Sequence, residues 1–266
     1  MAFEHIQLTR DAGVVTMTFN RPETRNSMTP AMGEEVVRAV DEIRRDSSAR
    51  VFVLTGSGKS FSSGGDLGML ARDAGVGGAE SAPSMEGSPR DFYLRYLAIR
   101  NLPIPSIAAI NGHAIGAGLC IALACDMRVA VADARMGMTF TRLGIHPGMG
   151  ATYFLPRLVG TARACELLFS GRVFDAGEAE RLGLVNRVVS REGFNDAVAS
   201  LAREIASSGP VAVRMVKKAI YRGDHHTLEE SLDFEALQQS ATFHTEDARE
   251  GIRAVMEKRE PKFTGR

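Results

Sequence analysis

The chain has 266 residues, of which 32 are Lys or Arg and 32 are Asp or Glu, so its formal net charge is zero. This balance argues against non-specific nucleic-acid binding, which needs an excess of positive charge, although a local basic patch for phosphates stays compatible with it. With 44% hydrophobic and 24% charged residues, the chain has the composition of a globular protein that can bury a substantial core, as one large domain or two small ones.

The predicted elements begin with a half-buried strand and a helix. Residues 15–19 alternate apolar side chains with threonine, which is typical of a strand with one face in the core. Thr29 and Pro30 predict a helix start, because threonine caps a helix N-terminus and proline fits the first turn. Apolar residues at helical spacing continue from 32 to 43, and a short buried strand is predicted at 51–55.

The strand-and-helix pattern then repeats. The segment 74–89 is rich in glycine and proline and predicts a long loop, which is either a lid over a site or a segment without function. A helix is predicted at 91–100 and a strand at 107–110. An apolar helix over 119–125 and a strand over 127–132 complete this part of the chain.

The last part of the chain is predicted to be helical. Asp175 with Glu178 resembles a capping box and indicates a short helix. No strand-like run follows residue 193, and helical periodicity covers 194–207, 210–221, 228–243 and 246–259. We therefore predict an α/β core over residues 1–192 and a C-terminal helical segment over residues 193–266.

Three cysteines, Cys120, Cys125 and Cys165, form no Cys-x-x-Cys pair, and the first two lie on an apolar stretch. We interpret those two as reduced core residues, as a cytosolic protein would carry. No apolar stretch approaches membrane-spanning length. We therefore expect a cytoplasmic protein with neither a membrane nor a nucleic-acid partner.

Two glycine-rich turns, at 61–67 and 111–118, follow two of the predicted strands. Glycine lets a ligand approach the backbone closely, and a helix that starts in such a turn directs unpaired N–H groups at whatever lies in front of it. One N–H from each turn can hold a single carbonyl oxygen, as an oxyanion hole does. Alternatively, each turn serves only to pack a helix on a strand.

The two turns, Phe-Ser-Ser-Gly-Gly-Asp-Leu and Asn-Gly-His-Ala-Ile-Gly-Ala-Gly, resemble the paired signatures of the crotonase superfamily, the enoyl-CoA hydratases and isomerases. The same resemblance covers, in the family's order, segments 20–22, 26–28, 144–148, 183–189 and 257–263. It implies a crotonase-like spiral of strand-strand-helix units and a pocket for an acyl-CoA thioester. Coenzyme A would enter as part of the substrate, with no tightly bound cofactor and no metal. It also implies a homotrimer or hexamer assembled through the C-terminal segment, although that segment's apolar stripe equally suits packing on its own core.

The resemblance places the oxyanion-hole N–H groups on Gly65 and Ala117. The residues that it implies for binding coenzyme A are Arg25, Ser63, Leu67, Lys258, Lys262 and Phe263. The last three could act from a neighbouring subunit, whereas a basic chain end is also common as a solvated tail. Relatives often carry a lysine where this chain has Gly68, so we expect one phosphate contact to be weaker.

The family's hydratases resemble one another in using two glutamates, and this chain has neither. One would lie three residues after Ala117, at Cys120, and the other seven residues before Pro147, at Phe140. A positioned general acid or base contributes on the order of 10² to 10⁴ in rate. We therefore expect hydration to be very slow, with Cys120 and Phe140 lining the acyl pocket. A substrate that carries its own leaving group, as in decarboxylation to an enolate, would still be served by the oxyanion hole.

Two other residues are candidates for the acid or base. His146 lies just past the second glutamate position, and imidazole is the commonest acid/base group at neutral pH. Tyr93 lies on the predicted helix that lines the acyl pocket in relatives. The alternatives are a turn residue bonded to backbone for His146 and simple packing for Tyr93. We interpret Asp66 as a helix cap rather than an acid.

Three functions stay open on these residues. The first is an acyl-CoA enzyme of the hydratase/isomerase family, acting in fatty acid metabolism as an isomerase, decarboxylase or hydrolase. The second is a hydratase that works slowly or recruits other residues. The third is an acyl-CoA-binding protein without turnover.

Overall fold

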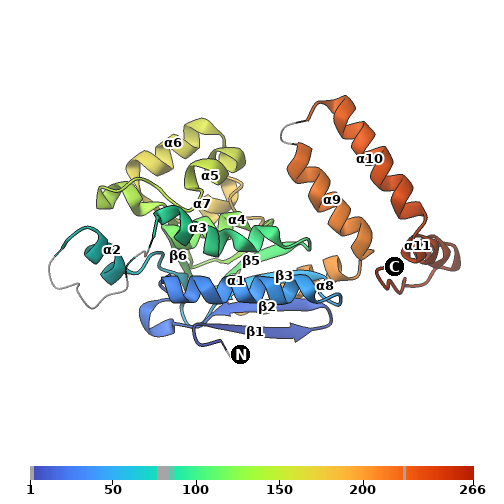
Figure 1. Cartoon of the computed structure of the whole chain (residues 1–266), viewed down its shortest axis with the longest axis horizontal. Helices are drawn as coiled ribbons and strands as arrows, with labels where there is room; N and C mark the ends of the chain where they lie inside the picture. The colour runs from blue at the N-terminus through green and yellow to red at the C-terminus, as the bar shows by residue number, and fades with distance from the viewer. Residues whose placement is uncertain (1–2, 77–83, 85–86, 224–225) are drawn as a thin grey trace.

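The computed structural model describes residues 3–76, 84, 87–223 and 226–266, and it has an α/β body from which a helical arm extends (Figure 1). A six-stranded sheet runs through the body in the order β1-β2-β3-β5-β7-β10. β1 is antiparallel to β2, and the other neighbours are parallel. The strands are β1 (Ile6–Asp11), β2 (Val14–Phe19), β3 (Val51–Gly56), β5 (Ser106–Ile110), β7 (Met127–Val131) and β10 (Arg187–Val189).

Four short strands form a second sheet in the order β4-β6-β8-β9. They are β4 (Ser60–Ser62), β6 (His113–Ile115), β8 (Arg135–Gly137) and β9 (Val173–Asp175). In the chain β4 follows β3, β6 follows β5 and β8 follows β7, so each of these pairs has one strand in each sheet. β4 and β6 lead into the helices α2 (Leu67–Asp73) and α4 (Ala117–Ala124). This order confirms the predicted α/β spiral of strand-strand-helix units.

The remaining helices of the body surround the sheets. They are α1 (Pro30–Arg45), α3 (Pro89–Leu97), α5 (Ala151–Val159), α6 (Thr161–Ser170), α7 (Ala176–Arg181) and α8 (Phe194–Ala206), with 3₁₀ turns η1 (Pro22–Thr24), η2 (Ala98–Asn101) and η3 (Thr139–Leu143). α8 contacts four strands of the large sheet, and α1 packs against α3 and η2. The predicted cap at Thr29 is confirmed, because its side chain accepts the Met32 N–H at 3.4 Å. Asp175 caps α7 by accepting the Glu178 N–H at 2.7 Å, but the predicted capping box is not formed, because the Glu178 carboxylate bonds to Arg172 instead.

The segment predicted as a long loop is only partly described, since residues 77–83, 85 and 86 lie outside the described residues. Pro89, the last residue of the predicted loop, belongs to a helix instead. α3 starts at Pro89, where Ser88 and Asp91 form a capping box. The helix predicted over 91–100 therefore begins earlier, and its last part is the 3₁₀ turn η2.

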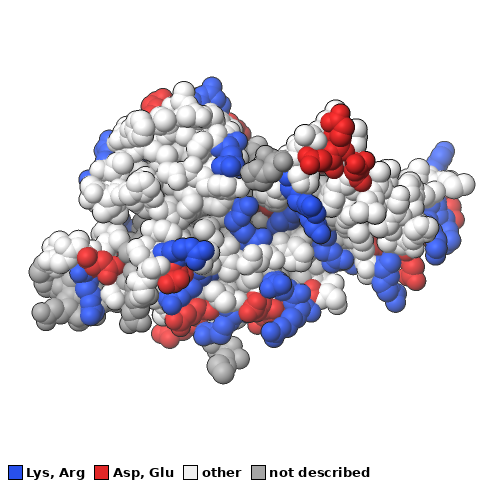
Figure 2. Space-filling model, turned by 45° about the horizontal axis from the view of Figure 1, so that its top comes forward, with Lys and Arg blue, Asp and Glu red and all other residues white. Residues whose placement is uncertain are grey.

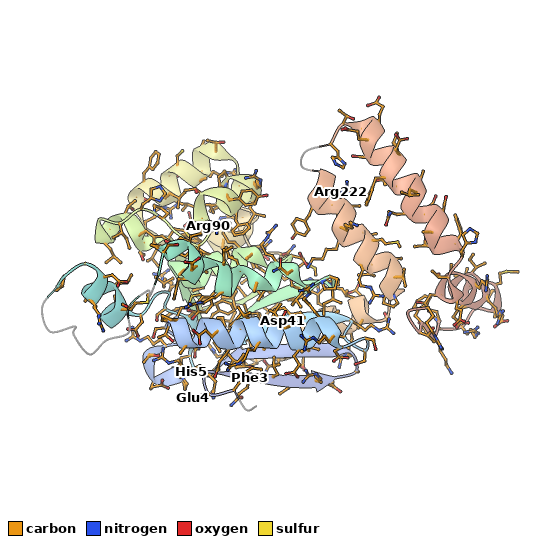
Figure 3. The ribbon with its side chains drawn as sticks, in the orientation of Figure 1. Phe3, Glu4, His5, Asp41, Arg90 and Arg222 are labelled. Atoms are coloured by element: carbon orange, nitrogen blue, oxygen red, sulfur yellow. The ribbon has the colours of Figure 1, made fainter. Side chains whose placement is uncertain are left out.

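α9 (Pro210–Gly223), α10 (Leu228–Phe243) and α11 (Glu246–Glu257) form the arm, at the opposite end of the molecule from α2 (Figure 1). α9 and α10 lie antiparallel, and the Arg222 guanidinium lies 4.7 Å from the centroid of the Phe234 ring (Figure 3). The Lys217 Nζ fastens α9 to the body, since it lies 2.8 Å from the Ile104 carbonyl oxygen and 2.8 Å from the Asp126 carboxylate. Within the described part of the chain, no helix is long and apolar enough to cross a membrane.

A cavity of about 590 Å³ lies between the arm and the body. Lys and Arg side chains gather along this hollow in Figure 2. The basic residues that line the cavity are Arg100, Arg214, Lys217, Lys218 and Arg222. Ala124, the last residue of α4, also lines it, so the cavity lies about 10 Å from the other end of that helix at Ala117.

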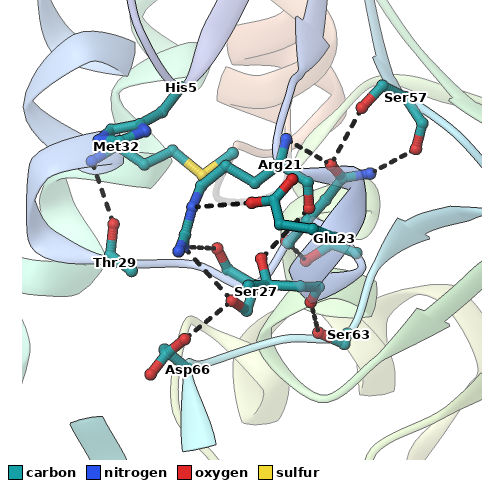
Figure 4. Close-up of polar contacts among 12 residues, drawn as sticks. His5, Arg21, Glu23, Ser27, Thr29, Met32, Ser57, Ser63 and Asp66 are labelled. Atoms are coloured by element: carbon teal, nitrogen blue, oxygen red, sulfur yellow. Dashed lines mark hydrogen bonds and ion pairs between the residues drawn. The ribbon is translucent and has the colours of Figure 1, made fainter. Parts of the chain in front are cut away.

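Asn26 holds three backbone segments together from a fully buried position. Its amide accepts the Arg21 N–H at 2.9 Å and donates to the carbonyl oxygens of Ser57 at 2.9 Å and Ser60 at 2.8 Å. Its φ of +56° lies in the left-handed region, which asparagine tolerates better than most residues. Figure 4 shows this network around Arg21 and Ser57. Asn26 therefore fixes the connection before α1 against the β3–β4 turn.

We expect Asn26→Ala to lower the free energy of unfolding by about 3 kcal/mol, because it leaves buried backbone groups without partners. Urea denaturation followed by circular dichroism measures the change. Asn195→Ala, at an exposed position of α8, is the matched control and should stay within about 0.5 kcal/mol of the parent. Equal stability of the two variants would show that the Asn26 network is dispensable.

Candidate active site

The two glycine-rich turns meet at one edge of the small sheet, because β4 and β6 pair in parallel. A Cβ on Gly64 would lie 2.6 Å from the Ile115 carbonyl oxygen and 3.2 Å from the Ala117 nitrogen. A Cβ on Gly118 would lie 2.5 Å from the Ser62 carbonyl oxygen. Real Cβ atoms do not approach backbone so closely, so both glycines are needed for the turns to touch.

Gly65 and Ala117 present their backbone N–H groups from these turns. On the first turn, Met28 donates its N–H to the Gly64 carbonyl at 2.8 Å and accepts the Asp66 N–H at 3.1 Å. This clamp holds the residues on both sides of Gly65. Ala117 is the first residue of α4, where N–H groups have no partner inside the helix. Among the residues that the structure describes, neither N–H has an acceptor, so both are available to an oxygen from outside the chain.

The first turn is supported by a polar network (Figure 4). The Asp66 carboxylate accepts the Met69 N–H at 3.1 Å and the Ser27 hydroxyl at 2.9 Å. Arg21 donates to the Ser27 carbonyl oxygen at 2.9 Å. The interpretation of Asp66 as a cap of α2 is therefore confirmed, and its carboxylate is fully engaged in fixing the turn.

Arg25, Ser63 and Leu67 all lie at this turn. The Ser63 N–H donates to the Arg25 carbonyl oxygen at 2.9 Å, and its hydroxyl donates to the Thr24 carbonyl oxygen at 3.3 Å. The Ser63 hydroxyl is therefore used in a hydrogen bond within the protein. Arg25 is exposed, and 73% of Leu67 is exposed at the start of α2, so both side chains are accessible to a ligand.

The positions of the two missing glutamates are apolar and lie beside the second turn. Cys120 is fully buried on α4, with its Sγ 3.5 Å from the Met138 Sδ and 3.6 Å from the Gly148 carbonyl oxygen. Burial raises the pKa of the Cys120 thiol far above its usual range, so the thiol stays neutral. The Phe140 ring on η3 is half-buried, and a Cβ on Gly116 would lie 3.9 Å from its tip.

Tyr93 lies close to Cys120, although the two residues come from different helices. A Cβ on Gly148 would lie 2.5 Å from the Tyr93 hydroxyl oxygen and 2.7 Å from its Cζ. Tyr93 is half-buried, and burial raises the pKa of its hydroxyl. Tyr93 and Cys120 therefore both contact Gly148. The sequence contains no local signal for this contact, because Gly148 lies far along the chain from α3.

His146 is exposed, and its Nδ1 lies 2.8 Å from the carbonyl oxygen of the next residue, Pro147. This contact is the one expected of a turn residue. No group of three or more His, Cys, Asp or Glu side chains that could hold a metal occurs in the described residues.

Lys258, Lys262 and Phe263 do not join the glycine turns of their own chain. Lys258 ends α11 with a φ of +55°, and the Lys262 N–H donates to Glu250 at 2.9 Å. The Phe263 ring packs against Gly251, where an added Cβ would lie 3.3 Å away. Since α11 and α2 occupy opposite ends of the molecule (Figure 1), a shared ligand contact needs a second copy of the chain.

Comparisons with known proteins identify the family. The model of the enoyl-CoA hydratase/isomerase family matches residues 9–266. A probable enoyl-CoA hydratase of Mycobacterium tuberculosis is 36% identical over the full length of both chains. The 1,2-epoxyphenylacetyl-CoA isomerase of Escherichia coli is 37% identical over 96% of this chain and 97% of its own. The crystal structure of an enoyl-CoA hydratase from Bacillus anthracis matches with a TM-score of 0.89 and 37% identity, covering 99% of this chain and all of that one. The chain therefore belongs to the enoyl-CoA hydratase/isomerase family of the crotonase superfamily.

Proposed function

We propose that this protein is an acyl-CoA thioester enzyme that stabilises a thioester enolate through the N–H groups of Gly65 and Ala117. The observation that carries the proposal is the pair of unpaired N–H groups on two touching turns, one of them at a helix N-terminus. Loss of one such donor typically costs about 3 kcal/mol of transition-state stabilisation. On a thioester, these two N–H groups would donate to the oxygen that becomes negatively charged in the enolate.

The reaction that fits best is one that needs an enolate and a single proton, rather than the addition of water. Hydration needs an activated water and a proton donor, whereas Cys120 and Phe140 supply neither. Decarboxylation of an α-carboxylated thioester generates the enolate without a base. When CO₂ leaves, the electrons of the broken C–C bond stay on the α-carbon of the thioester. Shifting a double bond also passes through an enolate.

An acyl-CoA-binding protein without turnover is the second candidate, because the two glutamate positions are apolar. A pocket lined by Cys120, Met138 and Phe140 without any acid or base would favour that reading. The hydroxyl of Tyr93 beside Gly148 argues for the enzyme, since it places one proton-bearing group next to Cys120.

Coenzyme A is proposed as part of the substrate, with Arg25, Leu67 and the backbone of Ser63 at the first turn. The C-terminal residues Lys258, Lys262 and Phe263 are proposed to reach it from a neighbouring subunit of a trimer or hexamer. The arm supports this arrangement because several of its large apolar side chains are exposed: Val216, Ile220, Leu228, Leu232, Leu237, Phe243, Ile252, Val255 and Met256.

Titration calorimetry with acetyl-CoA and a longer acyl-CoA tests binding, and we expect both to bind. At a hundred times the dissociation constant, the ligand should stabilise the fold by about 2.7 kcal/mol. Hydration of crotonyl-CoA should be far below about 10² per second. Fast hydration would show that the acid and base of the reaction have been assigned to the wrong residues. If neither thioester binds, the proposal of an acyl-CoA site is wrong. Binding with no turnover of 3-enoyl or α-carboxylated thioesters would establish the binding protein.

A further inference from the structure

Tyr93 and Gly148 fit together as a large and a small residue. The phenol of Tyr93 occupies the space that any side chain at position 148 would take, since an added Cβ would lie 2.5 Å from the hydroxyl oxygen and 2.7 Å from Cζ. The φ of Gly148 is not in the left-handed region, so its backbone conformation does not itself require glycine. Glycine at this position is therefore explained by the space that it leaves for Tyr93.

The Tyr93 hydroxyl differs from those of Tyr96 and Tyr221 in its hydrogen bonding. Tyr96 donates to the Thr29 carbonyl oxygen at 2.6 Å, and Tyr221 donates to Asp126 at 2.5 Å. The Tyr93 hydroxyl has no hydrogen-bond partner among the described residues, although its ring is half-buried and packs edge-on against Phe92 at 6.4 Å. A half-buried hydroxyl with no internal partner is free to bond to a ligand or to water.

This hydroxyl lies close to Cys120 of α4, because both side chains lie against Gly148. Cys120 is one helical turn further along α4 than Ala117, and its Sγ is 3.6 Å from the carbonyl oxygen of Gly148. Tyr93 and Cys120 therefore contact the same residue. His146, two residues before Gly148, is exposed and bonds to its own loop.

We propose that Tyr93 delivers the proton to the α-carbon of the thioester enolate, and that Gly148 is the positioning residue that lets its phenol enter the site. This inference rests on the enolate chemistry proposed above. The Tyr93 O–H bond breaks while a C–H bond forms at the α-carbon, and the thioester carbonyl is restored from the enolate. The tyrosinate then takes a proton from water, so no oxidant or further reactant is needed.

The protonation state of Tyr93 suits a donor. Desolvation raises the pKa of its hydroxyl above the usual value of 10, so the group stays neutral throughout the physiological range. It therefore cannot act as a base there, and it needs a reaction that produces an enolate without one. The rate of a reaction with this donor should be flat from pH 6 to pH 9, whereas an imidazole donor would lose activity as the pH rises through the neutral range.

The test is decarboxylation of methylmalonyl-CoA by the full chain in D₂O, because this reaction forms the enolate without a base. Isomerisation of a 3-enoyl-CoA needs a base at the α-carbon, so it is assayed only to test the proposed function. Tyr93→Phe keeps the ring and removes the hydroxyl, and it should lower kcat about 10²-fold with KM little changed. The parent should place deuterium on one face of the α-carbon, and Tyr93→Phe should give a racemic product because solvent then protonates the enolate. Tyr153→Phe, on an exposed tyrosine of α5, is the matched control and should behave as the parent.

Gly148→Ala tests the positioning role, since its Cβ displaces the phenol. It should reproduce the loss of stereoselectivity, whereas Gly193→Ala, whose Cβ would meet nothing closer than 3.6 Å, should not. If Tyr93→Phe keeps the rate and stereoselectivity, or His146→Ala removes them instead, the assignment of Tyr93 is wrong and the proposed function survives. If the parent turns over neither thioester, the proposed function itself fails, and the role of Tyr93 falls with it.

Discussion

Replacing Ala117 with proline should lower turnover of a CoA thioester by roughly 10²-fold, equivalent to about 3 kcal/mol of transition-state stabilisation. Proline removes the N–H that Ala117 presents at the first position of α4 and leaves the rest of the helix in place. The first helical position is where proline is best tolerated. The preceding Gly116, with φ of +54° and ψ of −123°, is not helical and so does not conflict with a following proline. Steady-state kinetics on the substrate that the parent consumes provides the measurement.

Thr161→Pro is the matched control for this variant. Thr161 is the exposed first residue of α6, also after a glycine cap, and it lies outside the candidate site. Circular dichroism melts of both variants separate loss of a donor from loss of the fold. A folded Ala117→Pro variant with undiminished turnover would exclude Ala117 from the oxyanion hole.

Replacing Cys120 with glutamate should destabilise the protein by about 4 kcal/mol at neutral pH instead of restoring a hydratase. Cys120 is fully buried between Met138 and Gly148, so a longer side chain overpacks the site. The introduced carboxylate would also lose its hydration without gaining a cationic partner. Such a loss is a large fraction of the 5–15 kcal/mol by which domains are usually stable.

The pH dependence of this variant has a definite sign. Burial would raise the folded-state pKa of the new glutamate above its unfolded value near 4.3, so the folded state binds the proton more tightly. The variant should therefore be closest in stability to the parent below about pH 4 and lose stability as the pH rises. Urea denaturation from pH 4 to pH 8 measures the difference in the free energy of unfolding between the variant and the parent. The control is Cys165→Glu, at a half-exposed position of α6. A constant difference across that range would mean that position 120 can solvate a carboxylate.

The sequence allows prediction of those turns and helices whose conformation depends only on residues close together in the chain. The glycine turns could be predicted because Gly64 and Gly118 each fill a role that no larger residue can fill. The helix start at Thr29 could be predicted because its side chain caps the following turn. The helices predicted at 228–243 and 246–259 are found at Leu228–Phe243 and Glu246–Glu257.

The features that it missed depend on contacts between distant segments. The strands of the small sheet have three residues each, which is too short for an alternating pattern to appear. α5 and α6 were not predicted either. The pairing of Tyr93 with Gly148, and the complete burial of Cys120, follow from the packing of α3 and α4 against the loop before α5. No local pattern in the sequence encodes those distances.

The contact between the two glycine turns also makes their N–H groups a single cooperative unit. Gly64 and Gly118 hold the turns together by backbone contact, and Met28 ties the first turn to the start of α1. Local opening of β4 or β6 would therefore dismantle both donors in one event rather than weaken one of them. Hydrogen exchange of the amides in the two turns should report the same opening free energy, and catalytic competence should follow the population of that closed state.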